Sequence, residues 1–134
     1  MAFELQQPVL FRHCDPAGLV YYPRYFEMIS DCVEAYFATC LNIPFADLHQ
    51  TAAVPTAHFD VTFTAPSRHG DMLVLGLTPE KIGRSSFAFD ITARCKSEVR
   101  FVSKQTIVHV DDTGAPQPWL AATRSIIQQQ LGAQ

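Results

Sequence analysis

The stretch FRHCDPAGLVYYPRYFE, residues 11–27, contains the signals from which the rest of the chain can be interpreted. Pro16 and Gly18 mark a turn, and Pro23 suits the first position of a helix, where a missing N–H costs nothing. Asp15 therefore stands just ahead of a helix N-terminus. Such a terminus presents unpaired backbone N–H groups and a partial positive charge, which favour a ligand oxygen that is becoming negative. This arrangement is suited to acyl chemistry.

The residues after this turn predict one long helix. From about Tyr22 to Leu41, apolar side chains recur at steps of three and four, and charged side chains occupy the other side. This length corresponds to about five turns. The predicted apolar stripe consists of Tyr22, Phe26, Ile29, Val33, Tyr36, Phe37, Cys40 and Leu41. The next segment, Ile43 to His49, is expected to be a connector with a short helical turn.

On both sides of this helix the apolar residues follow a period of two, which is typical of half-buried strands. A first strand is predicted from Phe3 to Phe11, at a sheet edge because of Pro8. Further strands are predicted in residues 59–65, 73–77, 87–95 and 99–110, with connections at Pro66, His69-Gly70, Pro79 and Gly83. These short connections imply antiparallel neighbours. The tail, residues 118–131, is expected to form a short helix or an extended cover.

This order of elements, a strand, a long helix and at least four antiparallel strands, indicates an α+β domain. The helix is expected to lie on the concave face of a curled antiparallel sheet. A chain of 134 residues fits a single domain, here residues 1–134. The helix covers only one face of the sheet. Because the strands are strongly apolar, we expect a partner chain to cover the outer face or an edge of the sheet. We therefore predict a homo-oligomer.

The composition argues against several classes of protein. A formal net charge of −3 and the even scatter of Lys and Arg provide no basic stripe for nucleic acid. The four cysteines show neither a C-x-x-C pair nor metal-like spacing with histidine, so we expect a reducing compartment and a cytoplasmic protein. The sequence has no apolar run of membrane-spanning length and no signal-like N-terminus, so we expect neither export nor a membrane partner.

The motif DPAGLVYYPRY, residues 15–25, lies between a predicted strand and a long helix. It resembles the active-site motif of the 4-hydroxybenzoyl-CoA thioesterase family of hotdog-fold proteins. Its Asp-Pro-Ala-Gly and Tyr-Pro-x-Tyr parts are most similar to the hydroxybenzoyl branch, whereas the family at large often has histidine at the position of Pro23. The resemblance implies a hotdog fold, with one helix wrapped by the sheet. It also implies a homodimer with sheets paired edge to edge, and association of dimers into a homotetramer.

The resemblance further implies an acyl-CoA thioesterase, a hydrolase without cofactor or metal, whose active sites lie at the dimer interface. Asp15 would be the catalytic carboxylate, either as nucleophile or as general base for water. The backbone N–H near Tyr22 would polarise the thioester carbonyl, and the Tyr22 ring is a candidate for substrate contact. Phe45 would help to close the acyl pocket. An aromatic acyl group such as 4-hydroxybenzoyl is the favoured substrate, with a short or branched aliphatic group as the main competitor.

The segment KIGRSS, residues 81–86, is the candidate for binding the nucleotide of CoA. The CoA phosphates require cations and backbone donors. In the family the corresponding turn is basic and contacts the nucleotide, so the resemblance assigns this role to Arg84 and Ser85. Here serines stand where a more basic cluster would be expected, and a solvated hairpin turn is the alternative.

Three other interpretations stay open at this stage. Asp15 could serve only as an Asx-turn or helix-capping residue. The domain could bind an acyl thioester, or another protein, without cleaving anything. A hydratase or dehydratase with a histidine-based site would have to use His13, for which a solvated or core-satisfied role is the simpler assignment. The remaining histidines lack metal-site spacing, and no serine has a nucleophile-elbow context.

Overall fold

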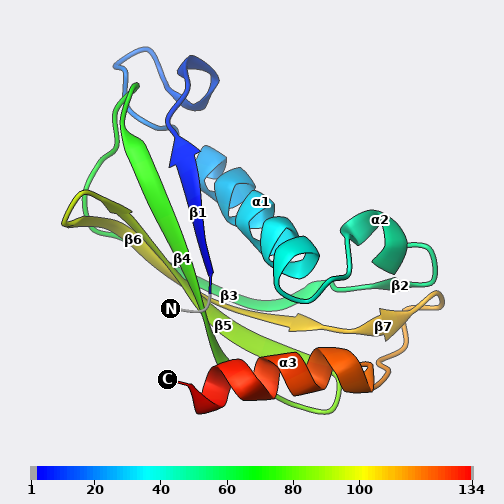
Figure 1. Ribbon diagram of the computed structural model, residues 1–134. Helices are drawn as coiled ribbons and strands as arrows, with labels where there is room; N and C mark the ends of the chain where they lie inside the picture. Colours follow the sequence, from blue (N-terminus) through cyan, green and yellow to red (C-terminus); the bar gives the residue numbers. More distant parts are fainter. Residues whose placement is uncertain (1–2, 134) are drawn as a thin grey trace.

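The computed structural model describes residues 3–133, in which an antiparallel sheet curls past the helix α1 (Figure 1). The sheet has five strands in the order β1-β4-β5-β6-β3. These strands are β1 (Phe3–Pro8), β3 (Thr56–Phe63), β4 (Met72–Ile82), β5 (Ser86–Cys95) and β6 (Glu98–Val108). A second sheet pairs β2 (Ala52–Ala53) with β7 (Val110–Asp111). The predicted α+β class is therefore confirmed.

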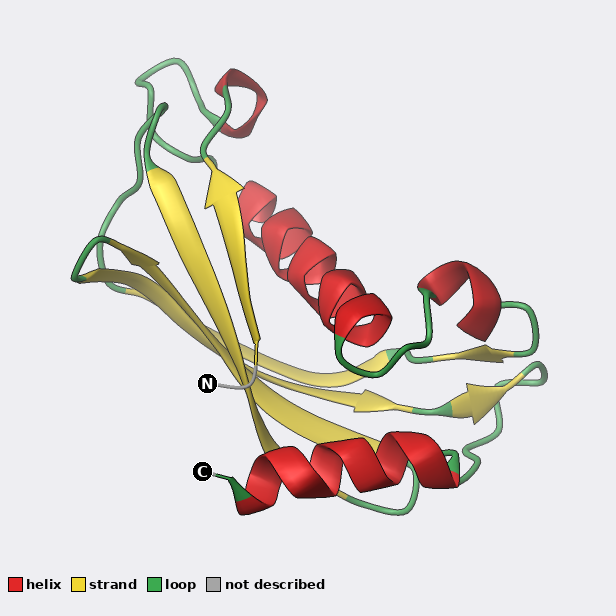
Figure 2. Cartoon of the chain, in the orientation of Figure 1, coloured by secondary structure: helices red, strands yellow, loops and turns green. Residues whose placement is uncertain are grey.

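Four helical segments accompany the sheets (Figure 2). They are the 3₁₀ helix η1 (Phe11–His13) and the α-helices α1 (Pro23–Thr39), α2 (Phe45–Leu48) and α3 (Ala121–Gly132). α1 packs on β1 and β4, and α3 packs on β4. Both the predicted short turn in the connector and the helix in the tail are present. None of the helices in residues 3–133 is long and apolar enough to cross a membrane.

The long helix is confirmed, but its buried side differs from the predicted stripe. The buried residues of α1 are Tyr25, Met28, Ile29, Cys32, Val33, Tyr36 and Phe37. Tyr22 and Phe26 belong to the predicted apolar stripe but are 59% and 37% exposed, so the stripe is not buried over its full width. The reason is that α1 is buried against the β1 and β4 side of the sheet, while the Phe26 ring lies against Phe59 of β3 at 5.3 Å. Phe63 of β3 is also exposed.

Two strand boundaries also differ from the predictions. β1 ends at Pro8, and Phe11 belongs to η1. Pro8 does lie in an edge strand, as predicted. Pro79 was predicted to lie in a connection but is part of β4, where a register shift between Pro79 and Lys81 changes the pairing with β5. Such irregularities are places where a strand accepts proline.

The core lies between α1 and the inner faces of β4 and β5. Its fully buried members include Leu73, Leu75, Leu77, Phe87, Phe89 and Ile91. Tyr36 sits at the centre, with its ring 6.1 Å from that of Phe87, and its hydroxyl donates a hydrogen bond to Gln130 Oε1 of α3. Burial raises the pKa of Tyr36. This hydrogen bond ties the C-terminal helix to the central one.

We predict that Tyr36→Phe lowers the free energy of unfolding by about 0.5–1.5 kcal/mol, because it removes one buried hydrogen bond and leaves the ring packing intact. Urea denaturation of the wild type, Tyr36→Phe, Gln130→Met and the double variant measures the coupling. If the two single losses simply add, the hydroxyl and the amide do not stabilise the fold as a pair.

Candidate active site

The predicted turn around Asp15 is present and is held by the Asp15 carboxylate. Asp15 Oδ1 accepts hydrogen bonds from the N–H groups of Ala17 and Leu19 at 2.9 and 3.2 Å. The Asp15 N–H donates to Leu19 O at 2.8 Å. Gly18 has a φ of +78°, a left-handed conformation that favours glycine. The turn-forming interpretation of Asp15 thus accounts for one of its two carboxylate oxygens.

The other oxygen, Asp15 Oδ2, accepts no hydrogen bond from any residue between 3 and 133. Asp15 is half-buried and lines a hollow of about 410 Å³ together with Tyr22, Tyr25 and Phe63. On its other side it lines a second hollow, next to Phe11. The turn therefore fixes the direction of the carboxylate and leaves one oxygen available to a bound molecule.

The start of α1 supplies a backbone donor in Tyr22, a residue that lines the same hollow as Asp15. Arg24 N–H donates to Tyr21 O at 2.8 Å, Tyr25 N–H donates to Tyr22 O at 3.1 Å, and Pro23 has no N–H. Tyr22 N–H has no hydrogen-bond partner among the described residues. The Tyr22 ring lines the same hollow as Asp15. The structure thus places Asp15 and Tyr22, the two residues that the sequence predicted to act on the carbonyl, at the same hollow.

A strap formed by residues 64–71 holds the Asp15 turn against the sheet. Val20 N–H donates to Ser67 O at 2.9 Å, and His69 N–H donates to Gly18 O at 3.2 Å. The C-terminal half of the turn is therefore hydrogen-bonded to a segment that connects β3 to β4.

Arg100 of β6 anchors this strap. Its Nη1 donates to Asp71 Oδ2 at 2.7 Å, to Pro66 O at 3.0 Å and to Ser67 Oγ at 3.2 Å. The hydrogen bond from Arg68 N–H and the one from Arg100 hold the pKa of Asp71 below its usual range. Sequence reasoning missed Arg100, because a charged residue in a strand carries no signal of a partner far away in the chain.

His13 is a buried residue of the core and does not pair with Asp15. It is 2% exposed, and its Nδ1 accepts a hydrogen bond from Leu10 N–H at 2.9 Å. The ring is therefore neutral, with its proton on Nε2. Burial, and after it the nearby Arg12 guanidinium, lower the pKa of His13. The structure supports the assignment of His13 as a buried, hydrogen-bonded residue. The histidine-based site of a hydratase or dehydratase therefore loses the one residue that was a candidate for it.

Phe45, Arg84 and Ser85 do not lie beside Asp15 within one chain. Phe45 begins α2, beyond the C-terminal end of α1, and its ring lies 5.2 Å from that of Phe37. Arg84 and Ser85 form the turn between β4 and β5. In Figure 1 this turn lies at the lower end of the molecule next to α3, whereas the loop after β1 lies at the upper end.

Phe45 instead lines a separate hollow between α1 and β3, which we call the α1–β3 hollow. Its volume is about 260 Å³. Its lining residues are Phe26, Ile29, Ser30, Val33, Phe45, His49, Val54, Thr56, Phe59, Gln105 and Ile107. The hollow beside Asp15 and this one lie along the same exposed side of α1, one helical turn apart at Tyr22 and Phe26.

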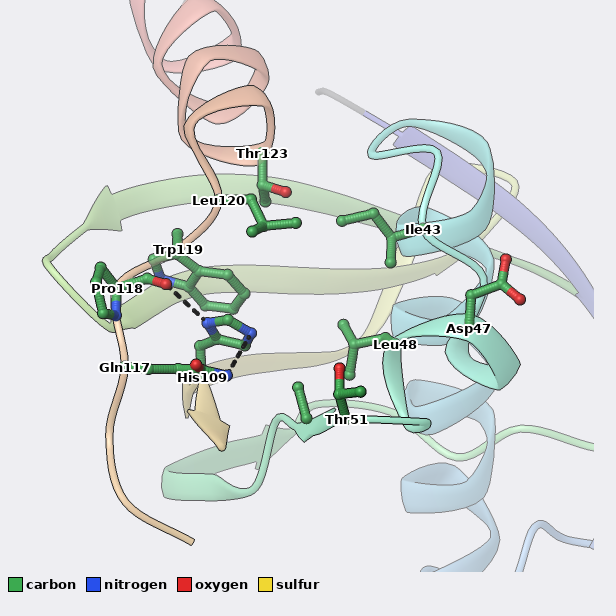
Figure 3. Close-up of a pocket in the computed structure, with 11 residues that line it drawn as sticks. Ile43, Asp47, Leu48, Thr51, His109, Gln117, Pro118, Trp119, Leu120 and Thr123 are labelled. Carbon is green, nitrogen blue, oxygen red and sulfur yellow. Dashed lines mark hydrogen bonds between the residues drawn. The ribbon is translucent and has the colours of Figure 1, made fainter. Parts of the chain in front are cut away.

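A further hollow of about 280 Å³ lies on the other side of α2, beside the start of α3 (Figure 3). The rings of His109 and Trp119 stack there with centroids 4.8 Å apart, and His109 Nδ1 is hydrogen-bonded to Pro118 O at 3.1 Å. None of the predicted site residues lines this hollow. We therefore do not assign it to the active site.

Comparison with known proteins identifies the family. The model of the thioesterase superfamily matches residues 17–102, and the chain belongs to this superfamily. It is 32% identical over 114 residues to a 1,4-dihydroxy-2-naphthoyl-CoA hydrolase of Nostoc punctiforme, in an alignment that covers 82% of this chain and 74% of that protein. The expected enzyme class, a thioester hydrolase, is thereby confirmed.

Solved structures confirm the hotdog fold. Slr0204, a 1,4-dihydroxy-2-naphthoyl-CoA thioesterase from Synechocystis, superposes with a TM-score of 0.86 at 19% identity, covering 94% of this chain and 95% of that one. The gentisyl-coenzyme A thioesterase BH1999 superposes with a TM-score of 0.83 at 21% identity, covering 91% and 99%. None of these names is that of a 4-hydroxybenzoyl-CoA thioesterase, so this finer expectation stays a prediction.

We predict that the free energy of unfolding falls as the pH is lowered from about 7.5 to 5.5, in part because of His13. Its pKa is lowered in the folded chain, so the unfolded chain binds the proton more readily. The stability from this residue is fully present above the ordinary pKa of 6.5 and is lost below it. Urea denaturation should show a flatter pH dependence for His13→Gln. The exposed His58→Gln is the control, and an unchanged slope in His13→Gln would contradict the prediction.

Proposed function

We propose that this protein hydrolyses an aromatic acyl-CoA thioester to the free acid and CoA. The observation that carries the proposal is that Asp15 and Tyr22 line the same hollow. Among residues 3–133, one Asp15 oxygen and the Tyr22 backbone N–H have no hydrogen-bond partner. The names of the relatives support an aromatic acyl group, since they refer to dihydroxynaphthoyl and gentisyl esters. The 4-hydroxybenzoyl group that the motif suggested belongs to the same class.

The chemistry follows from these two groups. The thioester carbonyl oxygen accepts a hydrogen bond from Tyr22 N–H, at the positive end of a helix of 17 residues. As a general base, Asp15 Oδ2 takes a proton from water while the hydroxyl adds to the carbonyl carbon, and the tetrahedral intermediate then expels the CoA thiolate. As a nucleophile, Oδ2 adds to the carbon itself and displaces the thiolate, and water then hydrolyses the resulting anhydride. Both routes need Asp15 ionised.

We propose that two copies pair through β3. This strand forms one edge of the described sheet, and exposed aromatic side chains lie beside it. A strand that pairs with its own copy about a two-fold axis runs antiparallel to it, which brings the Thr56 end of one strand towards the Phe63 end of the other. Such a dimer brings the Asp15 end of one chain towards the opposite end of its partner. This arrangement explains why Asp15 and Arg84 lie far apart within one chain.

The turn that carries Arg84 and Ser85 is proposed to bind the CoA nucleotide. α3 and the segment before it hold this turn in place, since Arg124 Nη2 donates to Gly83 O at 2.8 Å and to Arg84 O at 2.9 Å, and Trp119 N–H donates to Arg84 O at 3.1 Å. The Arg84 carbonyl is thus engaged, and its side chain is exposed. A guanidinium on a fixed turn is suited to a phosphate.

Several expectations remain predictions. These are the homotetramer, the cytoplasmic location, the independence from metal and cofactor, and a single domain over residues 1–134, of which residues 1, 2 and 134 lie outside the described structure. Within residues 3–133, no group of three or more His, Cys, Asp or Glu side chains is arranged to hold a metal ion. The second candidate function is an acyl-thioester-binding module without turnover, which the Asx-turn role of Asp15 favours.

Asp15→Asn should lower kcat for aromatic acyl-CoA esters by about 10²–10⁴-fold, because the amide can neither attack nor take a proton. Its Oδ1 still accepts the two turn hydrogen bonds, so the fold should persist, which circular dichroism checks. Thiol release from a panel of aromatic and aliphatic esters is the measurement, with the exposed Asp47→Asn as control. Equal, slow release by wild type and Asp15→Asn would contradict hydrolysis and favour the binding module.

Arg84→Ala should raise KM for the CoA ester about tenfold with kcat nearly unchanged, because a phosphate contact is lost and the reacting groups are not touched. The N-acetylcysteamine thioester of the same acid lacks the nucleotide and should be hydrolysed equally by both proteins. Lys96→Asn is the matched control, since Asn tolerates the φ of +56° at that exposed turn position. Equal effects on both thioesters would argue against a nucleotide site.

A further inference from the structure

Gln105, on β6, has a buried amide that is only half satisfied. The side chain is 8% exposed, and its Nε2 donates a hydrogen bond to Thr56 Oγ1 at 2.9 Å. Its Oε1 is fully buried and has no hydrogen-bond partner among the described residues. Leaving such an acceptor unpaired costs about 1–3 kcal/mol. The amide oxygen is therefore free to accept a hydrogen bond from a molecule that is not part of the described residues.

The surroundings of Gln105 indicate what kind of molecule supplies that group. Gln105 lines the α1–β3 hollow, where the Phe26 and Phe59 rings meet edge to face at 5.3 Å and Phe45 closes one end. A cavity of about 150 Å³ already holds benzene, and this hollow measures about 260 Å³. Its lining contains no Lys or Arg, so a carboxylate or phosphate would find no ammonium or guanidinium group there. An uncharged aromatic ring fits both the walls and the size.

We propose that this hollow binds the aryl ring of the acyl group and that Gln105 forms a hydrogen bond with a hydroxyl group on that ring. This inference rests on the proposed function and specifies its substrate class as hydroxyaryl-CoA. A phenolic hydroxyl donates to Oε1 when the Gln105 side chain turns this buried atom towards the hollow. If the amide is turned over, Thr56 Oγ1 donates to Oε1, and the phenolic oxygen accepts from Nε2. A hydroxyl group complements the amide in either orientation.

The position of the hollow suits this role. It continues along the side of α1 that carries Tyr22 at the Asp15 hollow, and Phe26 and Ser30 follow Tyr22 at successive helical turns. Gln105 does not line either hollow beside Asp15, and it forms none of the hydrogen bonds of the Asp15 turn. Gln105 is therefore assigned to substrate selection, while bond cleavage is left to Asp15.

The test compares kcat/KM for hydroxylated and unsubstituted esters in the wild type and in Gln105→Leu. The esters are 2-, 3- and 4-hydroxybenzoyl-CoA against benzoyl-CoA, and 1,4-dihydroxy-2-naphthoyl-CoA against 2-naphthoyl-CoA. We expect the wild type to prefer at least one hydroxylated ester by about 10–100-fold. In Gln105→Leu this preference should fall to about threefold or less, because the rate for the hydroxylated ester falls much more than the rate for the unsubstituted ester.

A merely structural role of Gln105 would lower the rates for both kinds of ester equally, and so would overturn the proposal. The matched control is Thr123→Val, a buried polar residue of the hollow on the other side of α2, which should leave the preference unchanged. Two further outcomes overturn the proposal but leave the proposed hydrolysis intact. In one, the wild type hydrolyses both kinds of ester equally. In the other, Gln105→Leu keeps the full preference for the hydroxylated ester.

If the wild type releases CoA from none of these esters, the proposed hydrolysis fails, and ligand binding then decides the role of Gln105. The probes are 4-hydroxybenzamide and benzamide, followed by saturation-transfer NMR. Binding of 4-hydroxybenzamide that weakens about tenfold or more in Gln105→Leu, with benzamide unaffected, supports the hydroxyl site. Equal binding of 4-hydroxybenzamide to both proteins overturns it.

Discussion

The structure depends on the fact that one helix cannot cover the whole concave face of the sheet. α1 buries one side against β1 and β4, and its other side faces β3 across a space that the short helix α2 reaches at one hollow but does not fill. Exposed aromatic rings and two hollows result on that side. In most proteins this incomplete coverage would be a weakness. Here it creates the space in which an acyl group can lie between helix and sheet.

The Asp15 turn shows how one side chain meets a structural and a chemical requirement together. Oδ1 is held by two backbone N–H groups, which fixes the carboxylate, and Oδ2 has no partner within residues 3–133. The strap that supports the turn is itself anchored by Arg100, whose guanidinium binds Asp71 and a backbone carbonyl. The turn-forming and catalytic interpretations of Asp15 are therefore compatible, since they use different oxygens of one carboxylate.

The proposed site divides its tasks between the two ends of the molecule. The acid and the helix start lie at one end, and the turn with Arg84 lies at the other. CoA is a long molecule. In the proposed β3-paired dimer, one substrate could therefore place its thioester at the Asp15 end of one protomer and its nucleotide at the Arg84 turn of the partner. The unpaired amide of Gln105 adds the third requirement, recognition of the ring itself.

The sequence by itself determined the elements whose signals are local. The helix from Pro23, the turn at Asp15, the alternating strands and the α+β class all follow from neighbouring residues, because capping, turn formation and apolar periodicity act over a few positions. The motif in residues 15–25 was also sufficient to indicate the family. These parts of the prediction needed no knowledge of long-range packing.

Only the tertiary structure decided which side of α1 is buried, where Phe45 lies, and which polar groups stay unpaired. Tyr22 and Phe26 fit the periodicity of a core stripe, but both stay partly exposed, because α1 is buried mainly against β1 and β4. Arg100 and Gln105 are ordinary strand residues in the sequence, and their roles depend on Asp71 and Thr56, which lie 29 and 49 positions away. Such pairings arise when distant strands come together, and no local pattern encodes them.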